Sequence, residues 1–379
     1  MVKDRLVNKK ICIVATSGIS LINFRGELIK SWIEKGNEVL CISIEKKEEM
    51  MPLVSKLGAR YIQVEGNRVD IGIISGLKMI KNYQKVFQNY KPDICYLYMS
   101  KPVAFGGIAA ILAKIPHINV LVNGLENAYY RKTIKDFIVR CVMSILYYNI
   151  ARKADNVFFQ NKDDMNYFRK HHLLSKKNES IVNGSGVDTT YFYRTKLPDD
   201  PCIIMVSRLL YSKGIREYLA AIEIVREKYP QTKFMLVGGL DENDEALSKD
   251  ELESFLSKTS IEYVGHSNDV REHIKKASIF VLPSYHEGLP RSILEAMAMG
   301  RVIITTNAPG CKETVKDGVN GFLVPVKDSK KLAEKIIFLI ENPLKLREMS
   351  DNSYNICLKK FEVSIVNKII NKRIEEKLL

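Results

Sequence analysis

Short apolar runs alternate with amphipathic stretches through the first half of the chain. β-branched and aromatic runs predict strands at 11–16, 38–44, 59–64, 93–99, 118–122 and 156–161. Between the first two runs, apolar residues recur at helical spacing as far as Gly36, which predicts a connecting helix. Because the runs lack apolar–polar alternation and are joined by helices, they predict a parallel sheet covered on both faces.

A second series of the same kind begins at Cys202. Its apolar runs predict strands at 202–207, 233–238, 261–265, 277–284, 301–306 and 321–326. The segment 190–201 carries the proline and aspartate residues of a linker. The sequence therefore predicts an α/β protein with two doubly wound, Rossmann-like domains, at 1–192 and 193–355. The last segment, 356–379, is expected to form a helix that packs back on the N-terminal domain.

The net charge of +14 is spread unevenly. From Met1 to Thr190 there are 29 basic and 17 acidic residues, whereas 191–379 holds 29 and 27. The N-terminal half therefore carries most of the positive field. This indicates an anionic partner there: a membrane surface, a phosphorylated lipid or a nucleic acid.

Composition narrows the class of protein. Apolar residues make up 46 % and charged residues 27 %, as in ordinary globular proteins. The seven cysteines form no C-x-x-C pair or zinc-like spacing, which predicts a reducing cytoplasm and no metal site. No signal peptide is expected. The longest apolar stretch, 141–151, is well short of the ~20 residues of a membrane span, so we expect no crossing.

In doubly wound sheets, ligands bind where strands feed into loops at their carboxyl ends. The loop S-R-L-L-Y-S-K-G follows a predicted strand and carries Arg208 and Lys213 ahead of a helix. A guanidinium, an ammonium and helix N–H groups suit a diphosphate. The alternative is a solvated loop with two ordinary surface charges.

The loop P-S-Y-H-E-G-L-P places Glu287 and Gly288 before a helix that starts near Pro290. Glu295 lies on that helix, eight residues beyond Glu287. Two structural alternatives stay open. Glu287 could be a charge that the helix dipole stabilises, and Glu295 could pair with Arg291 on the helix surface.

Two strand-to-loop glycines are further candidates. Gly239 stands in V-G-G-L-D and Gly18 in T-S-G, each directly after a predicted strand. A glycine at such a place lets the backbone approach a ligand closely. Each could equally form a tight turn and nothing more.

Together, the motifs R-x4-K-G, V-G-G, L-P-S-x2-E-G-x-P and E-x7-E resemble the signature of retaining, nucleotide-sugar-dependent glycosyltransferases of family 4. Order and spacing match over about 200–325. The chain is similar to bacterial polysaccharide and oligosaccharide glycosyltransferases that act on polyprenyl-diphosphate-linked acceptors in capsule, O-antigen or glycoprotein oligosaccharide synthesis. The resemblance implies the GT-B fold, in which two Rossmann-like domains face each other across a cleft.

The resemblance also implies the roles of individual residues. Arg208 and Lys213 would bind the donor's diphosphate, Glu287 the transferred sugar, and Glu295 the ribose hydroxyls. Backbone around the sugar and diphosphate would come from Gly18, Gly239, Gly288, Leu289 and Pro290. The donor is expected to be a UDP-linked hexose or N-acetylhexosamine, with no separate cofactor.

Two expectations concern the charges at the donor. The chain has no D-x-D motif to hold a metal, so Arg208 and Lys213 are expected to neutralise the leaving diphosphate without one. Without ligand, both side chains are expected to be unpaired.

The acceptor side of the N-terminal half departs from the family. Many relatives carry a histidine in a loop near the reacting sugar, but here the loop reads N-G-L-E-N-A-Y-Y. Asn123 and Glu126 are the candidates in its place, because His117 precedes the predicted strand. Arg25, in N-F-R, is a candidate for an acceptor diphosphate.

The positive half offers a surface for an anionic membrane. Basic residues flank the apolar run C-V-M-S-I-L-Y-Y or decorate the helix predicted at 74–90: Arg131, Lys132, Lys135, Arg140, Arg152, Lys153, Lys78, Lys81 and Lys85. Such helices suit the membrane interface, which predicts a cytoplasmic protein peripheral to the inner face of the cell membrane. The alternative for the apolar run is a buried core helix.

Two other function classes compete. A nucleotide-sugar epimerase or hydrolase would share the donor contacts but would need no acceptor and no membrane. A non-enzymatic binder of nucleic acid or anionic surfaces would explain the charge but not the strand-end motifs. The sequence lacks helix-turn-helix, zinc-finger or aromatic RNA-binding patterns, so we expect no nucleic-acid partner.

Overall fold

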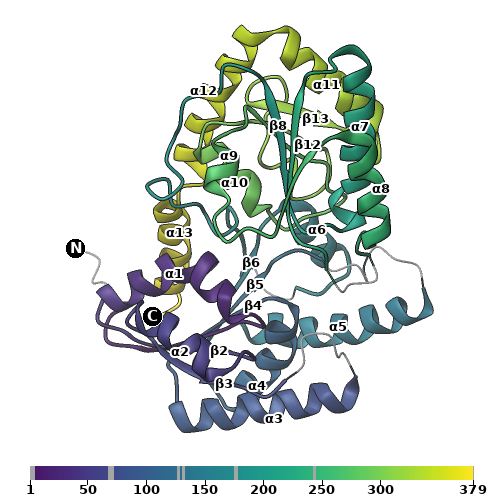
Figure 1. The fold of residues 1–379 in the computed structure, drawn as a ribbon. Helices are drawn as coiled ribbons and strands as arrows, with labels where there is room; N and C mark the ends of the chain where they lie inside the picture. Colours follow the sequence, from purple (N-terminus) through teal and green to yellow (C-terminus); the bar gives the residue numbers. More distant parts are fainter. Residues whose placement is uncertain are drawn as a thin grey trace. The chain divides into compact units, whose positions relative to one another are not determined.

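The computed structural model of the chain describes residues 5–66, 72–125, 129, 133–174, 178–241 and 245–378 (Figure 1). The chain divides into two compact units. Unit 1 consists of Met1–Ser185 and Val366–Leu379, and unit 2 of Gly186–Ile365. The first division lies a few residues before the predicted boundary at 192. The return to unit 1 comes at Val366 rather than at 356.

Unit 1 is built on a seven-stranded parallel sheet in the order β3-β2-β1-β4-β5-β6-β7. The strands are β1 (Lys10–Val14), β2 (Glu38–Ser43), β3 (Arg60–Gln63), β4 (Ile94–Tyr98), β5 (His117–Val122), β6 (Asn156–Phe159) and β7 (Glu179–Ile181). All but β7 coincide with predicted runs. The edge strand β7 is only three residues long, too short for a pattern to reveal it.

Helices cover both faces of this sheet. They are α1 (Gly18–Glu34), α2 (Lys47–Ser55), α3 (Ile73–Tyr90), α4 (Gly107–Leu112), α5 (Ile134–Lys153), α6 (Lys162–Lys170) and α13 (Val363–Glu375), with the π-helical turn η1 (Pro102–Gly106). In β1, Cys12 and Val14 join the core beneath α3, whereas Ile11 and Ile13 join the core beneath α1. Because both faces are buried, the strand is apolar at every position, as its sequence predicts.

The last helix, α13, packs against α1. Val366, Ile370 and Ile374 share one apolar core with Trp32. The Trp32 indole Nε1 donates a hydrogen bond of 2.8 Å to Asn371 Oδ1. The helix α13 therefore completes the apolar core of unit 1.

Unit 2 contains a six-stranded parallel sheet in the order β10-β9-β8-β11-β12-β13. Its strands are β8 (Cys202–Val206), β9 (Lys233–Val237), β10 (Glu262–Gly265), β11 (Ile279–Leu282), β12 (Val302–Thr306) and β13 (Gly321–Val324). The connections contain η3 (Tyr211–Lys213), α7 (Ile215–Lys228), α8 (Lys249–Thr259), α9 (Arg271–Ile274), α10 (Arg291–Ala298), α11 (Ser329–Glu341) and α12 (Pro343–Lys360). The predicted fold class, two doubly wound α/β domains, is confirmed.

The chain passes between unit 1 and unit 2 twice, and the two segments that do so lie side by side in unit 2. Val187 pairs with Glu362 in a parallel bridge, and its N–H donates to Phe361 O over 2.8 Å. The preceding residue, Gly186, has a φ of +69°, and a Cβ there would lie 2.6 Å from Val363 Cα. Only glycine allows the two segments to approach so closely.

Candidate functional site

The candidate site of unit 2 lies at the point where its strand order reverses. Strands β8 and β11 are neighbours, and the connections that follow them lead to opposite sides of the sheet. Loops that diverge in this way leave a crevice at the carboxyl edge. Arg208 and Lys213 follow β8, and Glu287 follows β11. The structure thus brings the predicted residues to one edge.

Lys213 and Glu287 form an ion pair across the two loops. Lys213 Nζ lies 2.5 Å from Glu287 Oε1, and the two side chains are only 20 % and 13 % exposed. The partial shielding from water makes this attraction stronger than that of an exposed pair. The expectation that Lys213 is unpaired without ligand is therefore wrong.

Close backbone packing holds the two loops together. Gly214, directly after Lys213, has a φ of +76°, and a Cβ there would lie 2.1 Å from Pro283 O. The carbonyl of Ser212 accepts hydrogen bonds from Ser284 Oγ and Tyr285 N–H over 3.0 and 2.9 Å. Gly214, the glycine of the K-G motif, therefore allows the backbone contact that positions Lys213.

Arg208 is also paired, contrary to expectation. Its Nη1 lies 3.0 Å from Asp241 Oδ2, in the loop after β9. The arginine side chain is mostly exposed, and exposed ion pairs contribute only about 0–1 kcal/mol, so an incoming anion can displace the carboxylate. Asp241 was not predicted, although the motif V-G-G-L-D places it at a strand end.

A third loop, after β12, packs its backbone against that of Glu287. The Glu287 N–H donates to Pro309 O over 3.0 Å. Gly310 has a φ of +80°, and a Cβ there would lie 2.2 Å from Glu287 O. Burial, and next the negative charge of Glu287, raise the pKa of the Cys311 thiol to about 12. Neither Gly310 nor Cys311 was predicted.

Glu295 takes part in the i,i+4 pair that was left open as an alternative. Arg291 Nε donates to Glu295 Oε1 over 3.1 Å, and both side chains are largely buried rather than on the helix surface. Burial raises the pKa of the Glu295 carboxyl above its ordinary value, and the Arg291 charge opposes this. Arg291 also donates to Gly186 O. The carboxylate is therefore held in a fixed orientation.

The residues between these two glutamates line the start of α10. Gly288, Leu289 and Pro290 are buried, and Pro290 directly precedes the helix. In the V-G-G motif, Gly238 is the glycine that the backbone requires, since a Cβ there would lie 1.8 Å from Ser207 O. At the predicted Gly239, a Cβ would meet only His266 Cβ, at 3.5 Å.

In unit 1 the strand order reverses between β1 and β4. Gly18 begins α1 there, and its N–H donates to Glu45 Oε2 over 2.7 Å. A Cβ at Gly18 would lie 2.7 Å from Ser43 Oγ and 2.9 Å from Met50 Cγ, so a larger residue there would have to displace these two side chains. The open alternative of a turn glycine accounts for this geometry, and a contact to diphosphate stays a prediction.

The acceptor-side candidates are held differently. Asn123 follows β5, and its Oδ1 accepts a hydrogen bond of 3.0 Å from the Met99 N–H, which fixes the loop after β4. Arg25 lies inside unit 1 with its guanidinium over the Tyr98 ring. Glu126 lies outside the described residues. His117 pairs with Asp155 over 2.9 Å at the start of β5, at the opposite edge from the strand-end loops.

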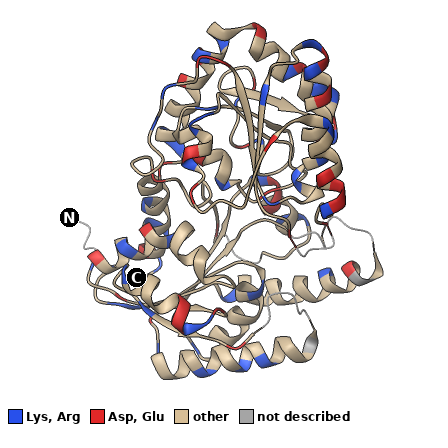
Figure 2. Ribbon diagram, in the orientation of Figure 1, with Lys and Arg blue, Asp and Glu red and all other residues tan. Residues whose placement is uncertain are grey.

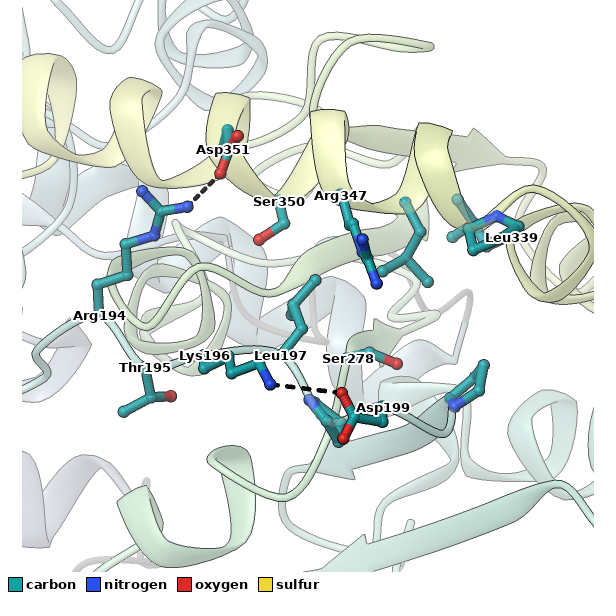
Figure 3. Close-up of a pocket in the computed structure, with 14 residues that line it drawn as sticks. Arg194, Thr195, Lys196, Leu197, Asp199, Ser278, Leu339, Arg347, Ser350 and Asp351 are labelled. Carbon is teal, nitrogen blue, oxygen red and sulfur yellow. Dashed lines mark hydrogen bonds and ion pairs between the residues drawn. The ribbon is translucent and has the colours of Figure 1, made fainter.

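A large depression of unit 2, about 810 Å³, lies away from all these residues (Figure 3). It is lined by Pro201 and Ser278, which precede β8 and β11, so it opens at the amino edge of the sheet. Four of its charged residues pair with one another: Arg194 with Asp351, and Lys196 with Asp199 over 3.5 Å. The depression lacks the convergent strand-end loops of the candidate site.

Known proteins are similar to this chain in sequence. The family described as "Glycosyl transferases group 1" matches residues 189–356. The chain is 29 % identical to N,N'-diacetylbacillosaminyl-diphospho-undecaprenol alpha-1,3-N-acetylgalactosaminyltransferase of Campylobacter jejuni, covering 88 % of this chain and 90 % of that protein. It is 25 % identical to UDP-Gal:alpha-D-GlcNAc-diphosphoundecaprenol alpha-1,3-galactosyltransferase of Escherichia coli, covering 78 % of each.

Solved structures share the fold. A glycosyltransferase from Rickettsia africae superposes with a TM-score of 0.79 at 17 % identity, over 98 % of this chain and 99 % of that one. HepE of Anabaena, solved in complex with UDP-glucose, gives a TM-score of 0.78 at 19 % identity, over 97 % and 100 %. At these identities the likeness concerns the fold alone.

The support of Glu287 by Gly310 can be tested with a matched pair of substitutions. Gly310→Ala and Gly318→Ala both place a side chain at positive φ, but nothing lies within 4 Å of a Cβ at Gly318. We expect Gly318→Ala to destabilise unit 2 by about 1 kcal/mol and Gly310→Ala to destabilise it clearly more, because the loop must move. Urea unfolding measures the difference. Equal losses of stability would mean that the loop adapts freely.

Proposed function

Since residues 189–356 form a glycosyl transferases group 1 domain, we propose that this glycosyltransferase moves a hexose or N-acetylhexosamine from a UDP-sugar to a polyprenyl-diphosphate-linked glycan. The observation that carries the proposal is the Lys213–Glu287 pair at the reversal point of unit 2. The Campylobacter jejuni and Escherichia coli relatives, whose names specify undecaprenol-linked acceptors, support the acceptor class. The UDP-glucose complex of HepE supports the donor class.

The two cations act on the donor's diphosphate. Lys213 and Arg208 exchange their carboxylate partners for phosphate oxygens when the donor binds. Negative charge then builds on the diphosphate as the bond between the sugar and the phosphate oxygen breaks. A preorganised charge aimed at such a site lowers the barrier by about 3–4 kcal/mol.

Glu287 acts on the sugar. Once Lys213 contacts the diphosphate, the Glu287 carboxylate accepts hydrogen bonds from the sugar hydroxyls and favours the oxocarbenium-like transition state. The acceptor hydroxyl attacks from the face that the diphosphate leaves, and a departing phosphate oxygen takes its proton. The product then keeps the configuration of the donor.

The remaining predicted residues bind and orient the substrates. Glu295, fixed by Arg291, accepts hydrogen bonds from the ribose hydroxyls, which a carboxylate can do in pairs. Backbone around the sugar and diphosphate comes from Gly288, Leu289, Pro290, Gly239 and Gly18. On the acceptor side, Asn123 positions the loop after β4, and Glu126 stays a candidate.

Unit 1 supplies a surface for an anionic membrane. Along α5, large apolar side chains are exposed at helical spacing: Ile134, Phe137, Ile138, Val142, Ile145 and Tyr148. On α3, Ile74 is 85 % and Leu77 62 % exposed. Figure 2 shows basic residues on the same helices, which include Lys78 and Arg140. The alternative of a core helix holds only for the opposite side of α5, where Tyr147 and Ile150 are buried.

The membrane contact is of the peripheral type. No helix in the described part of the chain is long and apolar enough to cross a bilayer. A helix that exposes both apolar and basic side chains lies in the interface instead, where anionic lipids contribute about 1 kcal/mol per basic residue. Arg131 and Lys132 lie outside the described residues, and nothing is described of the Lys135 side chain. The membrane face therefore consists of exposed side chains of α3 and of α5 (Ile134–Lys153).

Removing either diphosphate cation tests the donor site. We expect Lys213→Ala and Arg208→Ala each to lower turnover at least a hundredfold, because each removes one charge that stabilises the leaving diphosphate. Initial rates of nucleoside diphosphate release measure this. Lys213→Ala also leaves the Glu287 carboxylate without its cation, which could affect folding. In Lys213→Ala/Glu287→Gln that unpaired charge is removed as well, so comparing the stability of the two variants shows whether a loss of activity comes from misfolding.

The control for both variants is Lys228→Ala, which breaks the exposed Lys228–Glu341 pair of the same unit. It should keep its activity. Near-wild-type rates in both cation variants would refute the diphosphate assignment.

Metal independence is a separate expectation. Because Lys213 and Arg208 neutralise the diphosphate, turnover should persist in EDTA at an unchanged rate. Assays with and without chelator, followed by added magnesium or manganese, measure this. Activity that disappears with EDTA and returns with either metal would contradict the role given to the two cations.

The membrane face can be tested by replacing exposed apolar side chains of α5 with acidic ones. We expect the protein to co-sediment with vesicles containing phosphatidylglycerol at low salt, and less at high salt, because charges are screened beyond ~10 Å at 0.1 M. Ile138→Glu/Ile145→Glu should weaken this binding and lower activity on a lipid-linked acceptor, while UDP affinity is unchanged. Leu344→Glu is the control, because Leu344 is exposed in unit 2. Equal binding to neutral vesicles would argue for a soluble acceptor.

A further inference from the structure

Arg25 is a buried arginine of α1 for which the described residues supply no hydrogen-bond acceptor at Nε or Nη1. The residue is 1 % exposed. Among the described residues, no atom accepts a hydrogen bond from its Nε or Nη1. Its guanidinium lies 5.3 Å from the centroid of the Tyr98 ring. Burying a charge is strongly unfavourable unless the charge is paired and hydrogen-bonded, so Arg25 is an uncompensated cation.

Arg301 of unit 2 shows how a structural buried arginine is satisfied in this chain. It is 0 % exposed. Its Nη1 donates to Lys196 O over 3.5 Å, and its Nη2 to Thr195 O over 3.3 Å and to Thr195 Oγ1. Only its Nε lacks an acceptor. These bonds fasten the segment before β8 to the start of β12. In the described part of unit 1, no such set of oxygens surrounds Arg25.

Arg25 reaches the carboxyl edge of unit 1 where the strand order reverses. Tyr98 is the last residue of β4, and the neighbouring strand β1 leads into α1. The hydroxyl of Tyr96, on the same strand, is also buried and has no hydrogen-bond partner in the part of the chain that the structure describes. Ser20 Oγ lies 2.9 Å from Tyr98 Oη, which brings the first turn of α1 to the same point. The unsatisfied groups therefore gather where a doubly wound sheet binds ligands.

The chemistry of the missing partner follows from the donors. Nε and Nη1 together carry three N–H groups and share a positive charge, and a phosphoryl group offers several oxygens and the opposite charge. A neutral hydroxyl would leave the charge uncompensated. Ile19 and Phe24 on the same turns of α1 are exposed apolar side chains. A ligand with an anionic head and an apolar chain matches both features.

On the basis of the proposed function, we propose that Arg25 binds a phosphoryl group of the lipid diphosphate that carries the acceptor glycan. The guanidinium stays uncompensated in the substrate-free chain, and the lipid diphosphate supplies its counter-charge. Arg25 is thus a residue that selects the acceptor carrier rather than the donor. Its contribution is to ligand affinity, at the expense of the stability of unit 1.

Calorimetry with farnesyl diphosphate tests the ligand class. We expect the full chain to bind farnesyl diphosphate and to bind farnesol far more weakly, and Arg25→Met to lose at least tenfold in affinity for the diphosphate. Affinity for UDP should be unchanged in Arg25→Met, because the donor-binding side chains lie in unit 2 and Gly18 of unit 1 would contribute only backbone. Inorganic pyrophosphate separates the sources of the anion: binding as tight as that of farnesyl diphosphate would overturn the lipid assignment.

The stability of Arg25→Met distinguishes a ligand-binding role of Arg25 from a structural one, because only a structural role would make the variant less stable. Removing an uncompensated buried charge while keeping an apolar side chain should leave Arg25→Met at least as resistant to urea as the wild type. Arg301→Met is the matched control and should be destabilised, because it leaves the carbonyls of Thr195 and Lys196 without donors. The single tryptophan, Trp32, lies in unit 1 and reports the unfolding of that unit, whereas far-UV circular dichroism also follows unit 2 for Arg301→Met.

Several outcomes would overturn the proposal. They are no binding of farnesyl diphosphate to the wild type, equal affinity in Arg25→Met, or a destabilised Arg25→Met that still binds. Failure of the proposed function is a different result. In that case UDP fails to bind and no sugar is transferred, whatever the affinity for farnesyl diphosphate.

Discussion

The ion pair of Lys213 and Glu287 joins two loops that leave the sheet of unit 2 in opposite directions. A charge pair with so little exposure requires both loops to hold their positions to within a fraction of an ångström. Gly214 and Gly310 make this possible, because each lets one loop press its backbone against another. The carbonyl of Ser212 then ties the β8 loop to the β11 loop. The geometry of the ion pair therefore depends on these two glycines.

The charges of the two units are balanced in different ways. In unit 2 each cation has a carboxylate partner, so the substrate-free site is close to neutral at Lys213 and Arg208. In the proposed function, ligand binding there would exchange one anion for another, which would reduce the free energy gained but keep the side chains oriented beforehand. In unit 1, Arg25 lacks such a partner among the described residues. Under the two proposals, the cations of unit 2 would exchange a carboxylate for a phosphate, whereas Arg25 of unit 1 would bind its phosphate without displacing a partner.

The sequence predicted the strands well because both faces of each sheet are buried. Runs such as 202–206 have no polar positions, so they cannot be confused with a surface helix. The motifs that resemble glycosyltransferases stand at or after such strand ends, and the glycosyl transferases group 1 model matches residues 189–356, which contain them. The carboxylate partners escaped prediction because pairing depends on loops that are distant in sequence, as with Arg208 and Asp241.

Other features of the site could not be predicted from local pattern. Gly310 supports Glu287 from a loop over twenty residues away, and nothing in its own surroundings marks it. Arg25 sits in a polar stretch of an amphipathic helix, so its sequence context suggests exposure, whereas the structure buries it completely. The strand β7 is too short to produce a pattern. In each case the missing information is which segments meet in space.

The return of α13 to unit 1 determines the order in which the chain can fold as it is synthesised. Unit 2 is one continuous segment, Gly186–Ile365, inserted between β7 and the last helix of unit 1. A ribosome therefore releases all of unit 2 before Asn371 can meet Trp32. Until then the apolar side of α1 that α13 covers is open to water or to a chaperone. The first domain to be translated is the last to be finished.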